Sequence, residues 1–337
     1  MKTNLGFNLI ELIITLAISS IIITLLLGAY SSLYRSVYFN NHKTFLHQDL
    51  RFALAYIRHD LENAGVFAGI SFHNQNPGTI LDLIGDCSHD WCRYDKLTVG
   101  VKSYNNTTEI SDIGVHASSG SDILRVQFAG AKVAYYRATK SYVQSYPNST
   151  LSLDFYVPPQ NATTAISYML TSSNHAYLIN LATPQTNDSL LVKLPVKSAI
   201  NGILFDPDQE TMAFMPFQTK YYFINKDGAN GEAGLYVKSY DGTKLTKAKL
   251  LAKGVTDLKL RYQIALSNGL NHILDDTFPT NTTYSWCTTA EMGHGDCQWL
   301  NIIGVTVTLS IDSISPSNAK NISLAQMRES ITVSWLW

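Results

Sequence analysis

The stretch that decides the fold is residues 6–33, GFNLIELIITLAISSIIITLLLGAYSSL. From Leu12 to Leu33 no residue carries a charge. As a helix, these 22 residues span about 33 Å, which is enough to cross the hydrocarbon core of a bilayer. A secretory signal peptide has a shorter apolar stretch and then a small-residue cleavage site, whereas here the helical pattern continues and no proline precedes Pro77. The sequence therefore predicts a retained transmembrane helix at 7–33.

Beyond Leu33 the helical pattern becomes one-sided. Apolar residues recur at helical spacing at Leu46, Leu50, Ala53, Leu54, Ile57, Leu61 and Ala64, with charged residues between them. Gly65 is a natural helix stop. We expect one helix over 7–64, whose second half packs on a globular head.

Composition limits the classes of function. The chain has 337 residues, of which 15% are charged, and its formal net charge is −1. No basic excess is present to bind nucleic acid, so no nucleic-acid partner is predicted. The sequence has no G-x-S-x-G, H-E-x-x-H or P-loop motif, and we expect neither an enzyme nor a cofactor.

The rest of the chain, 65–337, alternates between strand patterns and turn signals. We expect strands at Lys96–Val101, Ile123–Phe128, Lys132–Ala138, Leu151–Val157, Ala176–Asn180, Leu190–Leu194, Thr219–Asn225, Gly234–Tyr240, Asp257–Ala265, Ile302–Ile311 and Ser330–Trp335. Asp227-Gly228 predicts that Thr219 to Tyr240 forms a hairpin. The fold class is α+β: a long N-terminal helix packed on an antiparallel β-sheet head, with a variable inserted region at about 66–215.

The four cysteines form two pairs that are local in sequence, Cys87 with Cys92 and Cys287 with Cys297. An even, paired set is typical of an oxidising compartment, and we favour two disulfides. The alternative is zinc, because His89 and His294 lie within the two loops, but neither spacing matches a known zinc finger. Trp91 lies inside the first loop, and Trp286 and Trp299 flank the second, so aromatic contact residues on these loops are a further alternative.

Glu11 stands at the start of the apolar run, where a carboxylate is costly unless something neutralises it. The residues from Gly6 to Leu12, GFNLIEL, resemble the prepilin cleavage motif of type IV pilins and type II secretion pseudopilins. The resemblance implies a leader at 1–6, which prepilin peptidase removes between Gly6 and Phe7, and N-methylation of Phe7. It also implies that Glu11 attracts the N-terminal amine of a neighbouring subunit during assembly. Two opposite charges that are each costly in a low dielectric would then neutralise each other.

Further segments are similar to PilW-type minor pilins. These are residues 49–65 at the end of the helix, 220–223 and 234–237 in the predicted hairpin, 254–262 in the next strand and 301–307 in a late strand. The middle of the chain is unmatched. The family often has a cysteine soon after the helix, and residues 65–70 contain none, so this chain departs from the family's disulfide pattern at this point.

The resemblance implies a minor pilin that primes assembly of a type IV pilus and lies in its tip complex. Its partners would be the major pilin and other minor pilins, through the N-terminal helix, and a tip adhesin. It would wait in the inner membrane as a single-pass protein, with its head in the periplasm, and then move to the pilus at the cell surface. Two alternatives stay open: a type II secretion minor pseudopilin, and a stem that displays an adhesin or other ligand-binding head.

Overall fold

The computed structural model describes a large part of the chain. The described residues are 9–67, 70–71, 80–82, 89–95, 98, 100–105, 118–130, 134–140, 150–155, 167–171, 176–180, 189–193, 211–225, 232–240, 244–266, 283–299, 302–311 and 327–334. The chain divides into two compact units, Met1–Asp49 and Leu50–Trp337.

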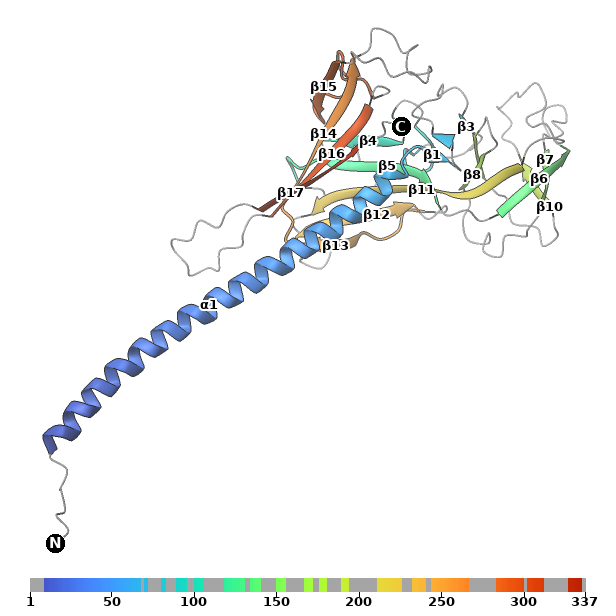
Figure 1. Cartoon of the computed structure of the whole chain (residues 1–337). Helices are drawn as coiled ribbons and strands as arrows, with labels where there is room; N and C mark the ends of the chain where they lie inside the picture. The colour runs from blue at the N-terminus through green and yellow to red at the C-terminus, as the bar shows by residue number, and fades with distance from the viewer. Residues whose placement is uncertain are drawn as a thin grey trace. The chain divides into compact units, whose positions relative to one another are not determined.

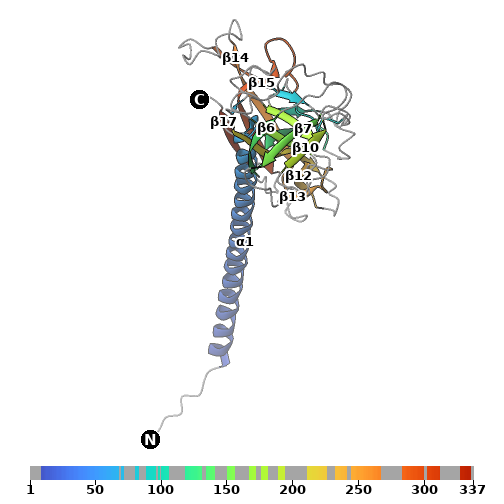
Figure 2. The same cartoon turned by 90° about the vertical axis from the view of Figure 1, so that its right-hand side faces the viewer.

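Helix α1 runs from Leu9 to Glu62, 54 residues in all, and is drawn as the blue ribbon in Figures 1 and 2. It ends two residues before the predicted Ala64. The chain then passes through Gly65, whose φ of 67° lies in the left-handed region that glycine adopts without strain. The Gly65 amide donates a hydrogen bond to the Gln127 carbonyl at 3.1 Å. Gly65 thus ends the helix and turns the backbone toward the sheet.

The strands of the second unit form a large sheet, a four-stranded sheet and a short two-stranded sheet. The short sheet pairs β1 (Val66–Phe67) with β2 (Ile70–Ser71). The large sheet contains β3 (Ile80–Asp82), β4 (Val101–Tyr104), β5 (Ile123–Ala129), β6 (Ala134–Lys140), β7 (Thr150–Phe155), β8 (Ser167–Thr171), β9 (Ala176–Asn180), β10 (Ser189–Lys193), β11 (Thr211–Asn225), β12 (Gly234–Tyr240) and β13 (Lys249–Lys253). Its pairings are antiparallel except that of β3 with β9. Figure 2 shows β6, β7 and β10 side by side, in agreement with their pairing.

Strand β11 is the centre of the large sheet and changes partners along its length. Its first part, Thr211–Pro216, pairs with β6 and β8, and its second part, Phe217–Asn225, pairs with β5 and β12. The β11–β12 pairing confirms the predicted hairpin, although β11 begins at Thr211 rather than at Thr219. The strand continues through Pro216, whose carbonyl accepts a hydrogen bond from the Gly130 amide at 2.8 Å.

The four-stranded sheet has the order β15 (Thr283–Thr288), β14 (Asp257–Leu266), β16 (Ile302–Ile311) and β17 (Met327–Ser334), with all pairs antiparallel. One face supplies part of the core through Leu258, Leu260, Tyr262, Val305, Val307, Leu309 and Val333, all of which are buried. Residues between them on β16, such as Thr306 and Thr308, are half-buried. This alternation is the period of two that the sequence shows.

One segment links the large sheet to the four-stranded sheet. The Ser118 amide donates to the Ile224 carbonyl of β11, and the Asp122 amide donates to the Leu258 carbonyl of β14. The Asp122 carboxylate also accepts a hydrogen bond from the Leu260 amide at 2.8 Å. The two sheets are therefore joined by main-chain hydrogen bonds as well as by packing.

The structure agrees with most predicted strands and differs at several. Ala176–Asn180, Gly234–Tyr240 and Ile302–Ile311 are confirmed with their predicted bounds. The strand predicted at Lys96–Val101 is wrong, because Thr98 and Gly100 lie in turns and β4 begins at Val101. Gly100 has a φ of 82°, and a Cβ there would lie 2.7 Å from the Gln127 carbonyl oxygen. The backbone bends at this point because it passes close to β5. Strands β1, β2, β3, β8, β13 and β15 lie outside the predicted strands.

Candidate functional site

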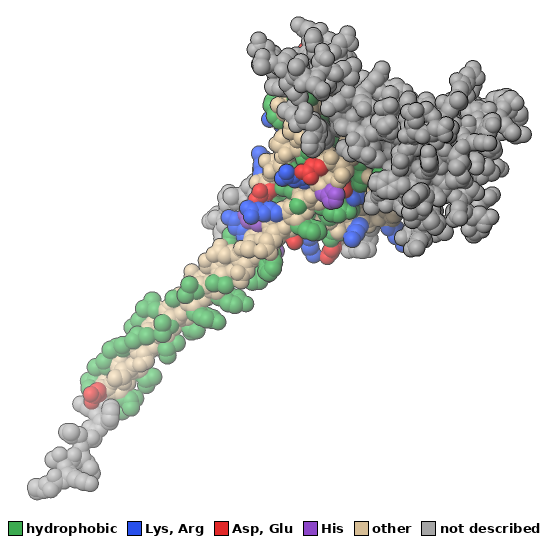
Figure 3. Space-filling model, turned by 45° about the vertical axis from the view of Figure 1, so that its right-hand side comes forward, with side chains coloured by type: hydrophobic (Ala, Val, Ile, Leu, Met, Phe, Trp, Pro, Cys, Tyr) green, Lys and Arg blue, Asp and Glu red, His purple; other side chains and the backbone are tan. Residues whose placement is uncertain are grey.

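The first half of α1 is apolar on all sides and exposed. The leucine and isoleucine residues from Leu9 to Leu27 are all exposed. Their exposed fractions range from 49% at Leu12 to 76% at Leu9. Figure 3 shows hydrophobic side chains along the visible face of this part of the helix. The helix is long and apolar enough to cross a membrane. An exposed apolar surface of this extent needs lipid or other protein around it.

Four hydroxyl groups within this apolar half are satisfied inside the helix. Thr15 donates to the carbonyls of Glu11 and Leu12, at 3.0 and 2.9 Å. Ser20, Thr24 and Ser31 bond in the same way to the carbonyls of Ala17, Ser20 and Gly28. Because a polar group in hydrocarbon is costly only when it lacks a partner, these residues are compatible with lipid.

Glu11 lies in the first turn of α1, where a carboxylate interacts favourably with the positive end of the helix dipole. Its side chain is exposed, and no cation of the described residues pairs with it. The other residues of the predicted processing site, Gly6 and Phe7, lie outside the described residues. The cleavage, the methylation and the amine contact therefore stay predictions.

The second half of α1 is built into the head. Leu50, Ala53, Leu54, Ile57 and Leu61 are all buried, as the periodicity predicts. These residues face the core of the second unit, so that each turn of the helix buries apolar area that would otherwise face water.

Asp60 lies on this same buried face and is only 4% exposed. Lys220 of β11 approaches its carboxylate at 2.8 and 2.9 Å, and the Tyr222 hydroxyl donates a hydrogen bond to it. Burial raises the pKa of Tyr222 well above its ordinary value, and the Asp60 charge raises it further. The ammonium of Lys220 also lies 4.7 Å from the centre of the Tyr56 ring. This cluster, here called the Asp60 clamp, joins α1 to β11.

The sequence does not predict the Asp60 clamp. Asp60 is one of the charged residues between the apolar positions of the helix. It lies three residues after Ile57 and one before Leu61, which places it on the apolar face of the helix. An acidic residue at such a position is a signal for a buried partner, although its position in sequence does not identify Lys220.

A second buried charge holds residues 89–95 and Thr98 against β5. Arg125 is completely buried and donates hydrogen bonds to Asp95 and Thr98, each at 2.9 Å. The neighbouring Gln127 donates to the carbonyls of Asp90 and Arg93. Burial raises the pKa of Tyr104, which donates to Asp90 at 3.2 Å.

The same segment carries Trp91, which the sequence offered as a contact residue. Its ring stacks on His89 at 5.0 Å and packs against Tyr240 at the same centroid distance. Trp91 also packs against the buried cluster of Tyr104, Ile123, Tyr221, Phe223 and Tyr236. It is therefore in part a core residue. Cys87 lies outside the described residues, so its pairing with Cys92 stays a prediction.

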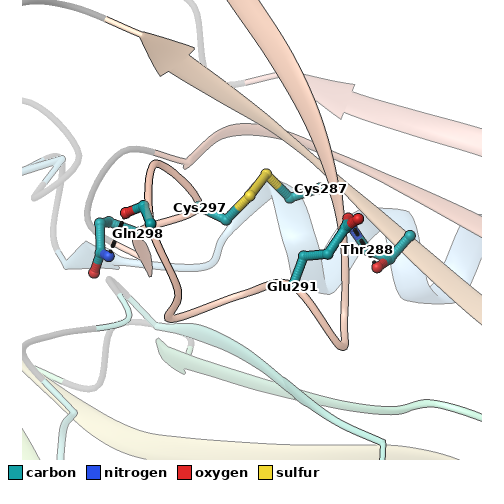
Figure 4. Close-up of a disulfide and its surroundings, with 6 residues drawn as sticks. Cys287, Thr288, Glu291, Cys297 and Gln298 are labelled. Atoms are coloured by element: carbon teal, nitrogen blue, oxygen red, sulfur yellow. Dashed lines mark hydrogen bonds between the residues drawn. A yellow bond between two sulfur atoms is a disulfide. The ribbon is translucent and has the colours of Figure 1, made fainter.

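Cys287 and Cys297 form a disulfide, which confirms that predicted pair (Figure 4). The disulfide closes the loop between these two cysteines. Glu291 fixes the start of this loop, because the Glu291 carboxylate accepts hydrogen bonds from the Thr288 amide and hydroxyl at 2.7 and 2.9 Å. These bonds lower the pKa of Glu291. Since both sulfurs are oxidised, this pair cannot supply the thiolates of a zinc site. In the part of the chain that the structure describes, no three His, Cys, Asp or Glu residues are grouped to hold a metal ion.

The two tryptophans beside this loop differ. Trp299 packs edge-on against buried Tyr262, with the ring centres 5.4 Å apart. Trp286 is 43% exposed, and the Arg261 guanidinium lies 5.9 Å from its ring centre. Of these two tryptophans, only Trp286 presents a large exposed aromatic surface.

Comparisons of the chain with protein-family models, with curated proteins and with solved structures found no match. The functional interpretation therefore rests on the residues and contacts described above.

Proposed function

We propose that this chain is a minor pilin of a type IV pilus, which primes pilus assembly and lies in the tip complex. The observation that carries the proposal is the division of α1 into two environments. Its first half exposes apolar side chains on every side, and its second half is buried in a β-rich head through Leu50 and Ile57. A subunit that must leave a bilayer and enter a helical bundle needs both halves.

Glu11 supplies the assembly chemistry of this proposal. Its carboxylate lies at the start of an otherwise uncharged run and is exposed. Removal of residues 1–6 would create an amine at Phe7, and that amine on a neighbouring subunit would neutralise the carboxylate. In the same proposal the head lies in the periplasm before assembly, where the Cys287–Cys297 disulfide is stable.

A genetic experiment tests the proposal. The gene is deleted, and the deletion strain is complemented with the unchanged gene, with Gly6→Ala or with Glu11→Ala. We expect surface pili to be lost or sharply reduced in the deletion strain, and neither variant to restore them fully. Glu11→Gln serves as the matched variant, because it keeps the size and removes the charge. Normal piliation and motility in the deletion strain would contradict the priming role.

A second experiment addresses processing alone. Mass spectrometry of the mature chain purified from membranes should give N-methylated Phe7 as its first residue. Any other first residue would contradict the pilin assignment. The neighbouring genes distinguish a type IV pilus from a type II secretion system. A cluster of type II secretion genes around this gene would make the chain a minor pseudopilin.

A further inference from the structure

Tyrosines collect at the end of the uncharged run of α1. Tyr30, Tyr34 and Tyr38 follow one another at intervals of four residues, so their side chains lie along one face of the helix. They are 68%, 63% and 68% exposed. The rings of Tyr30 and Tyr34 stack with their centres 6.4 Å apart. This face therefore combines apolar ring surface with a row of hydroxyl groups.

The charges near these tyrosines are all positive. Between Glu11 and Asp49 the only formal charges are those of Arg35 and Lys43. Both side chains are exposed. This part of the helix thus carries two cations and no carboxylate over more than thirty residues.

We propose that Tyr30, Tyr34, Tyr38 and Arg35 form a collar that contacts the anionic headgroup layer of a phospholipid bilayer, and that Lys43, about 20 Å along the helix from Tyr30, lies just outside this layer and is attracted by its negative surface potential. Tyrosine prefers the interface because its ring is apolar and its hydroxyl is hydrated. The two cations complement the phosphate charge. The inference goes beyond the proposed function, since it depends only on insertion of α1 into a bilayer and not on entry into a pilus.

The collar also fixes the depth of the helix. Tyr30 and Glu11 are 19 residues apart, which is about 28 Å along a helix. The hydrocarbon core of a bilayer is about 30 Å thick. With Tyr30 at one interface, Glu11 lies at the opposite interface, where water and headgroups hydrate its carboxylate. Ser20 is then at the midplane, and its hydroxyl is satisfied by the Ala17 carbonyl at 2.8 Å.

Depth is measured on the full-length protein in nanodiscs of phosphatidylcholine and phosphatidylglycerol. A nitroxide is attached to a single introduced cysteine in Ser20→Cys or in Ser32→Cys, under oxidising conditions that keep the Cys287–Cys297 disulfide closed. Accessibility to oxygen and to a water-soluble nickel complex gives the depth. We expect the label at position 20 to be the deeper one, with an oxygen-to-nickel ratio several times that at position 32. A label at position 32 as deep as the label at position 20 would overturn the proposal.

The role of the tyrosines is tested in the same labelled proteins. In the triple variant Tyr30→Ser, Tyr34→Ser, Tyr38→Ser, we expect both labels to change depth. The matched triple variant with tryptophan at these positions should keep the original depths. Unchanged depths in the serine variant would overturn the role of the collar. If both labels lie in water in the unchanged background, the helix is not inserted, and the membrane assignment fails with the collar.

The headgroup preference is tested with spin-labelled lipids. The unchanged protein should associate with labelled phosphatidylglycerol more than with labelled phosphatidylcholine, by up to about fivefold for each cation. The preference should fall in Arg35→Gln, Lys43→Gln and at high salt. The control Arg51→Gln, Arg58→Gln removes two cations that pair with Glu329 and Glu62, and should keep the preference. Equal association of the unchanged protein with both lipids would overturn the headgroup contact.

Discussion

The Tyr222 hydroxyl donates a hydrogen bond to the buried carboxylate of Asp60, and this contact joins the long helix to the central strand of the large sheet. The residues are 162 positions apart in the sequence. Lys220, two residues before Tyr222 on the same strand, supplies the opposite charge at 2.8 Å. The clamp lies within an otherwise apolar contact, so its members depend on one another for their polar partners.

Removing the carboxylate of Asp60 should weaken the attachment of the helix strongly. In Asp60→Ala the ammonium of Lys220, whose side chain is only 13% exposed, loses its partner, and so does the Tyr222 hydroxyl. We expect a loss of about 3 kcal/mol in the free energy of unfolding, measured by chemical denaturation of the full chain in detergent. Tyr56→Phe is the matched control, because the Tyr56 hydroxyl contact with Lys220 is exposed, and it should cost less than about 0.5 kcal/mol. Equal stability of Asp60→Ala and the unchanged protein would mean that apolar packing alone holds the helix.

Stability should fall above about pH 10. Burial raises the pKa of Tyr94, Tyr104, Tyr221, Tyr222 and Tyr262 above the ordinary value of 10.0. The folded state thus keeps phenolic protons that the unfolded state releases, so the stabilisation is complete below pH 10 and is lost as the pH rises. Each tyrosine adds a slope of about 1.4 kcal/mol per pH unit, to be measured by urea denaturation between pH 8 and pH 11.

The matched control for this pH dependence is Tyr262→Phe. It keeps the buried ring and removes one titrating group, so the alkaline slope should be shallower by about 1.4 kcal/mol per pH unit. A free energy of unfolding that is constant from pH 9 to pH 11 would contradict the burial of these hydroxyls.

Two cations near Asp95 should differ greatly in their contribution to stability. Arg125 is fully buried and lies 2.9 Å from the carboxylate, whereas the Lys102 ammonium lies 3.8 Å from it with a side chain that is 29% exposed. We expect Arg125→Met to cost about 3 kcal/mol, because it leaves Asp95 and Thr98 without their buried donor. Lys102→Met should cost less than about 1 kcal/mol. Thermal or urea unfolding measures both variants, and similar losses in the two would contradict this contrast.

The Cys287–Cys297 disulfide closes a short loop, with a sequence separation of 10. The double variant Cys287→Ser, Cys297→Ser frees this loop in the unfolded chain and should cost about 2 to 3 kcal/mol. Chemical denaturation under oxidising conditions measures the loss directly. Trp286→Ala is a useful comparison, since this exposed side chain should change stability little. A double variant as stable as the unchanged protein would show that the hydrogen bonds of Glu291 and the β14–β15 pairing suffice to hold the loop.

The sequence predicted strands in which apolar and polar residues alternate over several consecutive positions. Ile302–Ile311 is confirmed with its predicted bounds, because one face of β16 is buried by the core and the other is not. The sequence did not predict β15, Thr283–Thr288, which is the edge strand of its sheet beside β14 and contains no aliphatic residue. It placed the start of β11 at Thr219, although the strand begins before Pro216. A strand through proline is disfavoured locally, and here the partner strands on both sides override that preference.

The long helix, its change from uniformly apolar to one-sided, and its end within three residues of Gly65 can all be predicted from the sequence. These features are local, because helical periodicity and glycine conformation act over a few residues. Which buried charges meet is visible only in the folded chain. Asp60 and Lys220 are 160 residues apart, and Arg125 and Asp95 are 30 apart, so no local pattern identifies either pair. Their pairing follows from the burial of polar groups, which forces each charge to find a partner among the elements that fold against it.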